Sequence, residues 1–221
     1  MRRISKETRK DNQRFTSSED VDLSASKNAG LIEDRHQQIV AGACKVFFEK
    51  GFHPTTTRDL AAACGMSMGQ LYHYISSKDD VLYLVHKHYI MLWRDYLRNS
   101  MVESIADPKE KLAAALRNSL DFIFKNRRLS QFIFTESKHL ERKHLRTVLN
   151  LDNENIVKYW RDLLEEVNRQ TPIEGDLELL ANQIVFIQVF EPLRGWTVKN
   201  RLPEESRDAM IKFILRGLGL L

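Results

Sequence analysis

Residues 55–78 hold the side chains whose types and spacing are best suited to chemistry. The stretch contains two capping signatures, Thr56 followed by Asp59 and Ser67 followed by Gln70. In each pair a hydroxyl residue precedes an acid or an amide by three positions, which is the pattern of a helix N-terminus. We therefore expect two short helices whose outer faces present polar and aromatic side chains to a polar partner.

A tight turn joins the two expected helices. Ala61 is small enough for two helices to cross closely, Gly65 follows at the bend, and Leu71 anchors the second helix. Glycine at the bend permits the positive φ that ends a helix. These offsets are typical of a helix-turn-helix, in which the second helix binds DNA. An ordinary corner of two packed helices is the alternative, and any one of these features alone would suit it.

A longer run of residues resembles a known family. Residues 51–82, GFHPTTTRDLAAACGMSMGQLYHYISSKDDVL, closely resemble the DNA-binding domain of TetR-type (TetR/AcrR) transcriptional regulators. The resemblance covers about fifty residues, from 35 to 85, and implies a dimeric repressor that binds a palindromic operator. In one departure, many family members have Lys or Arg beside the glycine of the second helix, where this chain has Met68.

The outward positions and the resemblance together predict the DNA contacts. We expect Gln70 and His73 to read bases, since a Gln side chain can pair with adenine. Thr56, Thr57 and Lys78 are expected to contact phosphates. The full predicted set is Thr56, Thr57, Ser67, Met68, Gly69, Gln70, Tyr72, His73, Tyr74 and Lys78.

The bulk composition is that of a soluble globular protein. The chain has 221 residues, of which 43% are hydrophobic and 29% charged, and its net charge is +4. This length allows one large domain or two small ones, and the basic balance is compatible with a polyanion such as DNA. We expect no membrane partner, because no apolar run is long enough to cross a bilayer.

The N-terminus lacks the hydrophobic stretch of a secretory signal, and Cys44 and Cys64 fall on inward positions of the expected helices. Buried thiols and a cytoplasmic protein are therefore expected.

The chain divides into three predicted parts. Residues 1–30 have few apolar groups and are expected to form a flexible basic arm, which is either solvated or in contact with a DNA groove. Residues 31–78 form the predicted helix-turn-helix DNA-binding domain. Residues 79–221 form the predicted effector-binding and dimerisation domain, and within it residues 79–98 are a linking helix that belongs to both domains.

The third part has helical periodicity and no strand-like alternation of any length. We therefore predict an all-α fold, with an N-terminal three-helix domain that contains the helix-turn-helix and a C-terminal helical ligand-binding and dimerisation domain. Residues 176–191 and 204–218 form the last two long helices, which are more apolar than one chain requires. The resemblance implies a homodimer through a four-helix bundle of these helices, and its twofold symmetry would match a palindromic operator.

Large aromatic side chains in the third part suggest a ligand pocket. The resemblance implies such a pocket, and the segments FIFTESKHL and EPLRGW are similar to the branch that senses acyl-CoA thioesters. We therefore expect a small hydrophobic effector, with an acyl-CoA as the candidate, and no cofactor. Simple filling of the core is the alternative for each ring. The candidate pocket residues are Phe122, Phe132, Phe134, Trp160, Phe186, Phe190, Trp196 and, for the CoA phosphates, Arg194.

The sequence offers little for catalysis. It has no glycine-rich phosphate loop and no nucleophile elbow. Glu136 with His139, and Glu141 with His144, match the spacing of half a di-iron site, but both pairs lie on one segment. Such a site needs the pairs on different helices. We therefore expect no catalytic residue, no metal and no enzyme. An architectural DNA-binding protein without an effector is the alternative, and a helical-bundle metalloenzyme is the least favoured.

Overall fold

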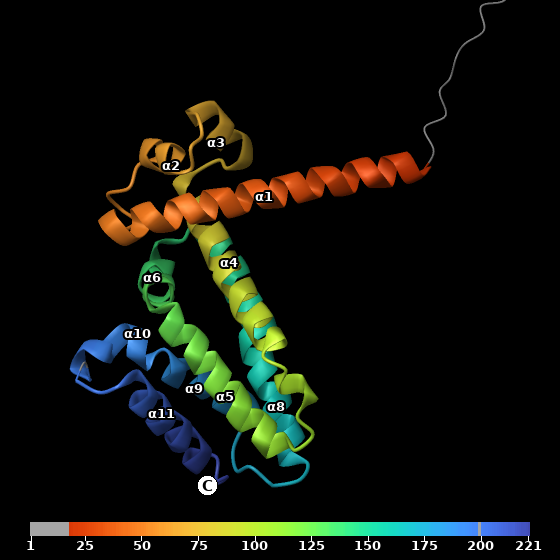
Figure 1. Ribbon diagram of the computed structural model, residues 1–221, viewed down its shortest axis with the longest axis vertical. Helices are drawn as coiled ribbons and strands as arrows, with labels where there is room; N and C mark the ends of the chain where they lie inside the picture. Colours follow the sequence, from red (N-terminus) through yellow and green to blue (C-terminus); the bar gives the residue numbers. More distant parts are fainter. Residues whose placement is uncertain (1–17, 199) are drawn as a thin grey trace, which may run out of the picture.

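The computed structural model describes residues 18–198 and 200–221, and in these residues it contains helices and no strand (Figure 1), which confirms the all-α prediction. No helix in this part of the chain is both long and apolar enough to cross a membrane. The α-helices are α1 Ser18–Lys50, α2 Thr57–Ala63, α3 Met68–Tyr74, α4 Lys78–Asn99, α5 Pro108–Lys125, α6 Arg127–Glu136, α7 Arg142–Asp152, α8 Lys158–Asn168, α9 Leu177–Gln188, α10 Phe190–Arg194 and α11 Pro203–Gly217. The shorter elements are the 3-10 helices η1 Val102–Ser104, η2 Ser137–His139 and η4 Gly195–Thr197, and the π-helical segment η3 Asn153–Val157.

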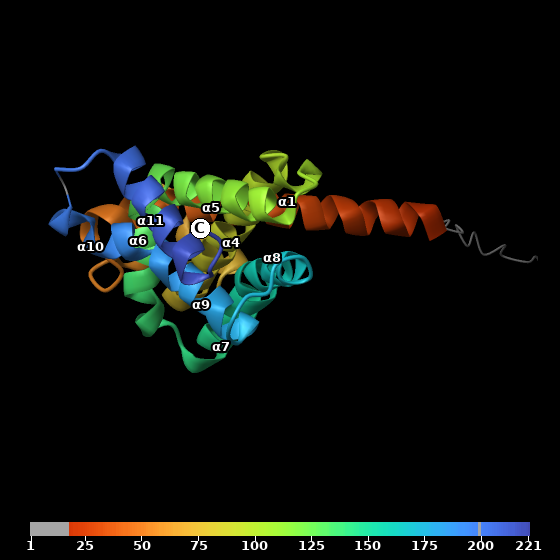
Figure 2. The same ribbon diagram turned by 90° about the horizontal axis from the view of Figure 1, so that it is seen from below.

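The first helix begins earlier than the sequence predicts. Residues 18–30 were expected in the arm, but α1 starts at Ser18, and Figures 1 and 2 show its N-terminal part projecting away from the other helices. This segment lacks the apolar period of a packed helix, so its sequence resembles an arm. It also has no proline to stop a helix that the packed second half has nucleated. The rest of the predicted arm, residues 1–17, lies outside the described residues.

Helices α1, α2 and α3 form the helix-turn-helix unit at one end of the molecule (Figure 1). Ile39 and Phe47 of α1 lie in one buried cluster with Leu60 of α2 and Leu71 of α3. Gly65 takes a φ of 63° at the bend, as the sequence predicts. The outer faces of α2 and α3 are thereby left free of the core.

Capping boxes define where three of these helices begin. In each one, the hydroxyl oxygen of the cap residue accepts from the N–H three residues later, and that later side chain accepts from the N–H of the cap residue. An N-cap of this kind contributes about 0.5–2 kcal/mol. Because α2 and α3 have only seven residues each, they would not persist without caps and packing. The pairs are Thr56 with Asp59 at α2, Ser67 with Gln70 at α3 and Ser77 with Asp80 at α4.

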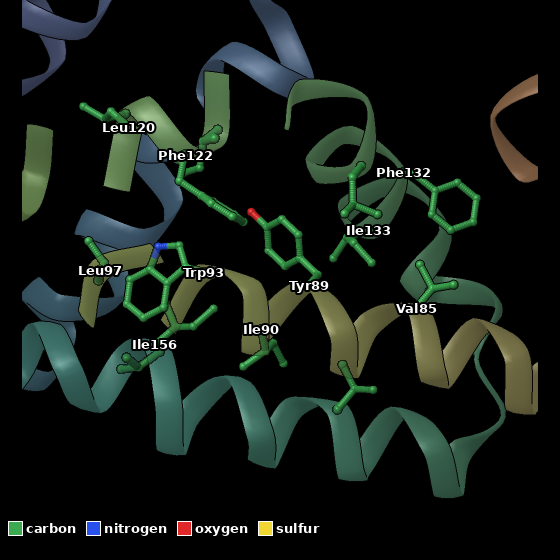
Figure 3. Packing of buried hydrophobic residues seen from close by; sticks show 14 of the residues in the cluster. Val85, Tyr89, Ile90, Trp93, Leu97, Leu120, Phe122, Phe132, Ile133 and Ile156 are labelled. Carbon is green, nitrogen blue, oxygen red and sulfur yellow. The ribbon is translucent and has the colours of Figure 1, made fainter. Parts of the chain in front are cut away.

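The long helix α4 joins the helix-turn-helix unit to the rest of the chain. It packs against α1 at one end and against α5, α6 and α7 along its length. Tyr89 and Trp93 of α4 point into the core that Phe122 of α5 and Ile156 of η3 complete (Figure 3). One continuous apolar core therefore runs from the helix-turn-helix unit into the C-terminal helices, so a movement of α4 affects both.

A close contact between α1 and α2 sets the position of the turn. A Cβ atom on Gly42 would lie 2.6 Å from Cys64 Sγ and 2.9 Å from the Cys64 nitrogen. Gln38 holds the same place, since its side-chain amide donates to the Cys64 carbonyl at 2.7 Å. Cys64 is a free, buried thiol whose pKa is raised by burial, as expected from the sequence. Glycine at position 42 thus lets the end of α2 lie directly on α1.

Replacing Gly42 by alanine tests this contact. Alanine favours a helix over glycine by about 1 kcal/mol, yet here its Cβ would collide with the backbone of Cys64, so we expect a net loss of about 1–3 kcal/mol. Gly30→Ala is the matched control, because Gly30 lies in the same helix and nothing lies within 4 Å of its Cβ position. Urea unfolding measures both variants. A Gly42→Ala protein as stable as the Gly30→Ala protein would contradict the contact.

Candidate nucleic-acid interface and effector cavity

The outer face of α3 presents most of the side chains predicted to bind DNA. Ser67, Gly69, Gln70 and His73 are exposed, and Tyr72 is 48% exposed. They lie on a short helix at the end of the molecule opposite the C-terminus (Figure 1). The major groove of DNA, about 12 Å wide, admits one α-helix. This helix face therefore has the size and polarity to enter it.

Two predicted contacts on α3 are turned partly inward. Met68 and Tyr74 are half-buried and pack against the core. Each lies three positions from Leu71, which is fully buried, and residues three apart share one face of a helix. The outward orientation predicted for Met68 is therefore wrong, and Tyr74 contributes more to packing than to the exposed face.

The Gln70 side chain takes part in the cap of α3 and is also exposed at the surface. Its Oε1 accepts from the Ser67 N–H at 2.9 Å, while its own N–H donates to the Ser67 hydroxyl at 3.2 Å. A bidentate pair with adenine needs both the oxygen and the nitrogen of the amide. Because the oxygen is already used by the cap, the Nε2 donors are the part of Gln70 available to a base, and they suit acceptors on the base edge.

The two threonines predicted to contact phosphate also hold the unit together. The Thr56 hydroxyl donates to Asp59 Oδ2 at 2.8 Å, and the Thr57 hydroxyl accepts from the Tyr72 hydroxyl at 3.3 Å. The Lys50 ammonium, 2.8 Å from Asp59, holds the pKa of that carboxyl well below its usual range. Thr57 and Tyr72 thus join α2 to α3 at the surface that would face DNA.

Lys78 has a different role from the one its position suggests. Its Nζ donates to three backbone carbonyls, those of Phe52 at 2.8 Å, His53 at 3.0 Å and Thr55 at 2.9 Å. It also lies 4.4 Å from the centroid of the Phe52 ring, and partial burial lowers its pKa. An ammonium group has three N–H donors, and all three are used here. In this structure Lys78 closes the loop between α1 and α2, so the phosphate contact predicted for it would require it to give up at least one of these bonds.

The eight residues predicted to line one pocket do not lie together. Phe122 packs on Tyr89, with 5.6 Å between the ring centroids. Phe132 stacks instead on Phe47 of α1 at 5.2 Å, and Figure 3 shows it well apart from Phe122. The prediction of a single pocket is wrong, because a count of aromatic residues does not say which rings meet.

A second group of the eight faces an open groove. Phe186, Phe190 and Arg194 line a groove of about 730 Å³ formed by α9, α10 and α11. Trp196 is not part of the lining; it is 65% exposed, and the Arg194 guanidinium lies 5.6 Å from the centroid of its ring. Phe186 is 73% exposed. These rings form a surface rather than an enclosed site.

The remaining two, Phe134 and Trp160, line a small cavity in the C-terminal core. Its volume is about 20 Å³, enough for one water molecule. Trp93 Nε1 donates to the Ser119 hydroxyl at 2.9 Å, and Ser119 donates in turn to Gln188 Oε1. Trp160 is fully buried, and its Nε1–H has no hydrogen-bond partner among the described residues. The lining of the cavity is thus aromatic, and one of its residues, Trp160, carries a donor with no partner among the described residues.

Sequence reasoning missed the polar members of this cavity. Ser119 and Gln188 are both buried, and each lies on the apolar face of its helix, in register with Leu116 of α5 and Ile184 of α9. A polar residue inside an apolar face was the one available signal.

The two Glu–His pairs connect different elements. His139 Nδ1 lies 2.9 Å from Nε2 of His53 in the loop before α2, and its Nε2 lies 3.6 Å from Glu136. His144 instead contacts Asp79 of α4. In the described part of the chain, no three His, Cys, Asp or Glu side chains are grouped so that they could hold a metal ion. Both histidines thus lie where the C-terminal helices meet the helix-turn-helix unit.

Comparison with known proteins points to one family. Residues 39–83 match the family described as bacterial regulatory proteins, tetR family. The HTH-type transcriptional regulator HbdR of Aromatoleum sp. (strain CIB) is 25% identical over 191 residues, which cover 86% of this chain and 80% of that protein. The HTH-type transcriptional repressor KstR2 of Mycobacterium tuberculosis (strain CDC 1551 / Oshkosh) is 24% identical over 151 residues, which cover 68% of this chain and 75% of that protein.

Solved structures share the fold. The structure of AibR in complex with isovaleryl coenzyme A and operator DNA matches with a TM-score of 0.67 at 21% identity, covering 81% of this chain and 97% of that chain. A likeness at this identity shows the fold alone. The family and the curated relatives are transcriptional regulators rather than enzymes, in line with the prediction that the chain is not an enzyme.

Lys78→Met separates a structural lysine from one that contacts phosphate. Hydrogen bonds from a charged donor contribute about 1.5–3 kcal/mol, so we expect urea unfolding to show a loss of that order. The slope of log Kd for DNA against log salt should not change, since each lost phosphate contact would lower it by about 0.9. Lys45→Met, at an exposed position of α1, is the control for the loss of one charge. A flattened slope with unchanged stability would restore the phosphate role.

Proposed function

The chain belongs to the TetR family of bacterial transcriptional regulators, and from this we propose that it is a homodimeric repressor that a hydrophobic effector releases from its operator. The observation that supports DNA reading best is the exposed face of α3, held by a capping box at its start and by Leu71 in the core. Gln70 Nε2 and His73 are the proposed base readers. Tyr72 and Thr57 are hydrogen-bonded to each other, and we place them at the edge of this exposed face.

A homodimer would supply the second half of the recognition surface. One helix of seven residues covers only a few base pairs, whereas two copies related by a twofold axis would fit half-sites about 34 Å apart. The face proposed for dimerisation is formed by α9, α10 and α11, where four large apolar side chains are exposed in the single chain. They are Leu179 (59%), Phe186 (73%), Phe190 (40%) and Phe213 (67%). Exposed apolar area of this kind is typical of an interface.

The small cavity is the proposed starting point of effector binding. Its lining includes the unpaired Trp160 N–H but no charged side chain. A buried carboxylate would find no cation there, whereas a carbonyl oxygen would accept from Trp160. A thioester carbonyl followed by an acyl chain therefore suits the site, and the AibR complex shows that a protein of this fold binds an acyl-CoA. The CoA part would remain outside the cavity.

Effector binding would weaken DNA binding by changing the relation of the two recognition helices. The cavity must enlarge to take an acyl group, and α4, which helps to line it through Tyr89 and Trp93, begins directly after α3. An effector that prefers the enlarged state by about 1–3 kcal/mol would weaken DNA binding by roughly 5–150-fold.

Fluorescence anisotropy with DNA from upstream of the chain's own gene, repeated with acyl-CoA thioesters of increasing chain length, tests the function. We expect tight, salt-dependent binding that one class of thioester weakens by about 5–150-fold. Trp160→Phe keeps the ring and removes the N–H, so thioester affinity should fall about 5–10-fold. Trp196→Phe, at an exposed ring outside the cavity, should bind as the parent does.

Other outcomes of this experiment are equally informative. Binding to DNA that no thioester changes would discard the effector and favour an architectural DNA-binding protein. Equal thioester affinity in the Trp160→Phe and Trp196→Phe variants would move the effector site elsewhere. Absence of specific binding, in the upstream region and in sites selected from random DNA, would disprove the function.

Phe213→Glu tests the proposed dimer face. The side chain is 67% exposed in the single chain, so the change should spare the fold and place a charge inside the interface. We expect a monomer in sedimentation velocity and loss of tight operator binding. Leu149→Glu, at an exposed apolar residue of α7 (57%), is the matched control and should stay dimeric. A Phe213→Glu protein that still sediments as a dimer would contradict the assignment of this face.

A further inference from the structure

Two neighbouring carboxylates at the start of α4 have separate roles. Asp80 closes the capping box, accepting from the N–H groups of Ser77 at 2.9 Å and Ser76 at 2.6 Å. Asp79 is 7% exposed and turns to the C-terminal domain, where its Oδ1 accepts from the backbone N–H of Glu141 at 3.0 Å. A buried carboxylate is costly unless it is paired. The partners of Asp79 thus lie in α7 and its cap rather than in its own helix.

Asp79 acts as the cap that α7 lacks. Glu141, the N-cap residue of α7, makes no side-chain capping bond of its own. The first N–H groups of a helix are unpaired, and its N-terminus favours a negative charge. The Asp79 carboxylate supplies both the acceptor and the charge from another helix. The N-terminus of α7 is therefore bound to the first turn of α4.

His144 forms a second connection between α7 and α4. Its Nδ1 contacts Asp79 Oδ2, its Nε2 lies 3.3 Å from Asp80 Oδ1, and its ring stacks on Tyr83 with 5.1 Å between the centroids. Both ring nitrogens face a carboxylate, so a single side chain of α7 spans both acids of α4. We name the group of Asp79, Asp80, Glu141 and His144 the α4–α7 latch.

The helix that carries His144 continues to the cavity. Helix α7 passes without a loop into η3 and then α8, and Ile156 of η3 and Trp160 of α8 line the cavity. From His144 to Ile156 the distance along the helix is ~18 Å. Within η3, the Asn155 side chain donates to the Leu151 carbonyl at 2.7 Å. A π-helical turn contains a surplus residue in an otherwise α-helical ladder and is often found at functional sites. At η3, the continuous helix formed by α7, η3 and α8 can therefore shift its hydrogen-bond register.

At its other end the latch adjoins the loop that positions α2. Asp79 follows Lys78, whose ammonium binds the carbonyls of Phe52, His53 and Thr55. Thr56, the N-cap of α2, comes next. A displacement of the first turn of α4 would therefore move the start of the helix-turn-helix with it.

We propose that the α4–α7 latch, with His144 as its positioning residue, transmits effector binding in the C-terminal cavity to the helix-turn-helix. The proposal rests on the proposed function, because it assigns the route by which the same effector acts. The route runs from the cavity through η3 and α7 to Asp79, and through Lys78 to the loop before α2. None of the four latch residues lines the cavity, and none belongs to α3.

His144→Phe tests the latch because it keeps a flat ring over Tyr83 and removes both polar contacts. DNA affinity and thioester affinity are measured separately and then together by anisotropy. We expect each separate affinity to stay within about threefold, while the ratio of DNA Kd with and without thioester falls from about 5–150-fold toward 1. Arg146→Gln, at an exposed position of the same helix, should keep the parent's ratio. His144→Arg, whose positively charged guanidinium can donate to both carboxylates, should restore part of it, whereas it would not rescue a purely packing role.

The outcomes separate the latch from the proposed function. If the His144→Phe protein releases DNA as the parent does, the latch proposal is wrong. If the parent itself responds to no thioester, the effector part of the proposed function fails, and amide hydrogen exchange of the unliganded protein tests the latch alone. Faster exchange at residues 52–57 as well as 141–145 in the His144→Phe variant would support it, and unchanged exchange at 52–57 would overturn it. Asp79→Asn serves the same measurements if His144→Phe does not fold.

Discussion

The placement of the helix-turn-helix depends on one ammonium group. The loop between α1 and α2 turns the carbonyls of Phe52, His53 and Thr55 toward each other, where they cannot pair among themselves, and Lys78 satisfies all three. Backbone carbonyls need hydrogen-bond partners, and a cation with three donors suits three acceptors at once. Because Lys78 is the first residue of α4, the loop that starts α2 is tied to the helix that enters the C-terminal domain.

Helices α2 and α3 are consequently rigid attachments rather than independent elements. With seven residues each, they are shorter than an isolated helix needs to be, and their order derives from caps, from Leu60 and Leu71 in the core, and from the contact of Gly42 with Cys64. A unit of this kind moves as one body when its supports move. Small changes at α1 or at the start of α4 are therefore sufficient to displace the whole exposed face of α3.

The sequence predicted what local patterns determine. Capping boxes, the glycine bend and the apolar faces depend on residues three to seven positions apart, and the structure confirms them. It did not predict Lys78 as a structural residue, because its partners lie 23–26 residues earlier in the chain. Distance along the chain also explains why the predicted aromatic pocket was wrong. Phe132 stacks on Phe47 of the other domain, and no local spacing encodes this pairing. The start of α1 was missed because a helix can extend beyond its packed segment without an apolar period.

The small volume of the C-terminal cavity bears on how the proposed effector would act. A preformed cavity would admit a ligand without any movement of its walls. A ligand that binds two conformations of the protein equally well does not change the equilibrium between them. A cavity of about 20 Å³ is too small for an acyl chain, so the proposed effector would have to favour a different arrangement of α4, α5, α8 and α9. Opening the cavity would lower the affinity for the effector. The same coupling would let the bound effector shift the helix-turn-helix toward the state that binds DNA weakly. A tightly packed core beside one unpaired donor is thus better suited to a switch than a large, ready pocket would be.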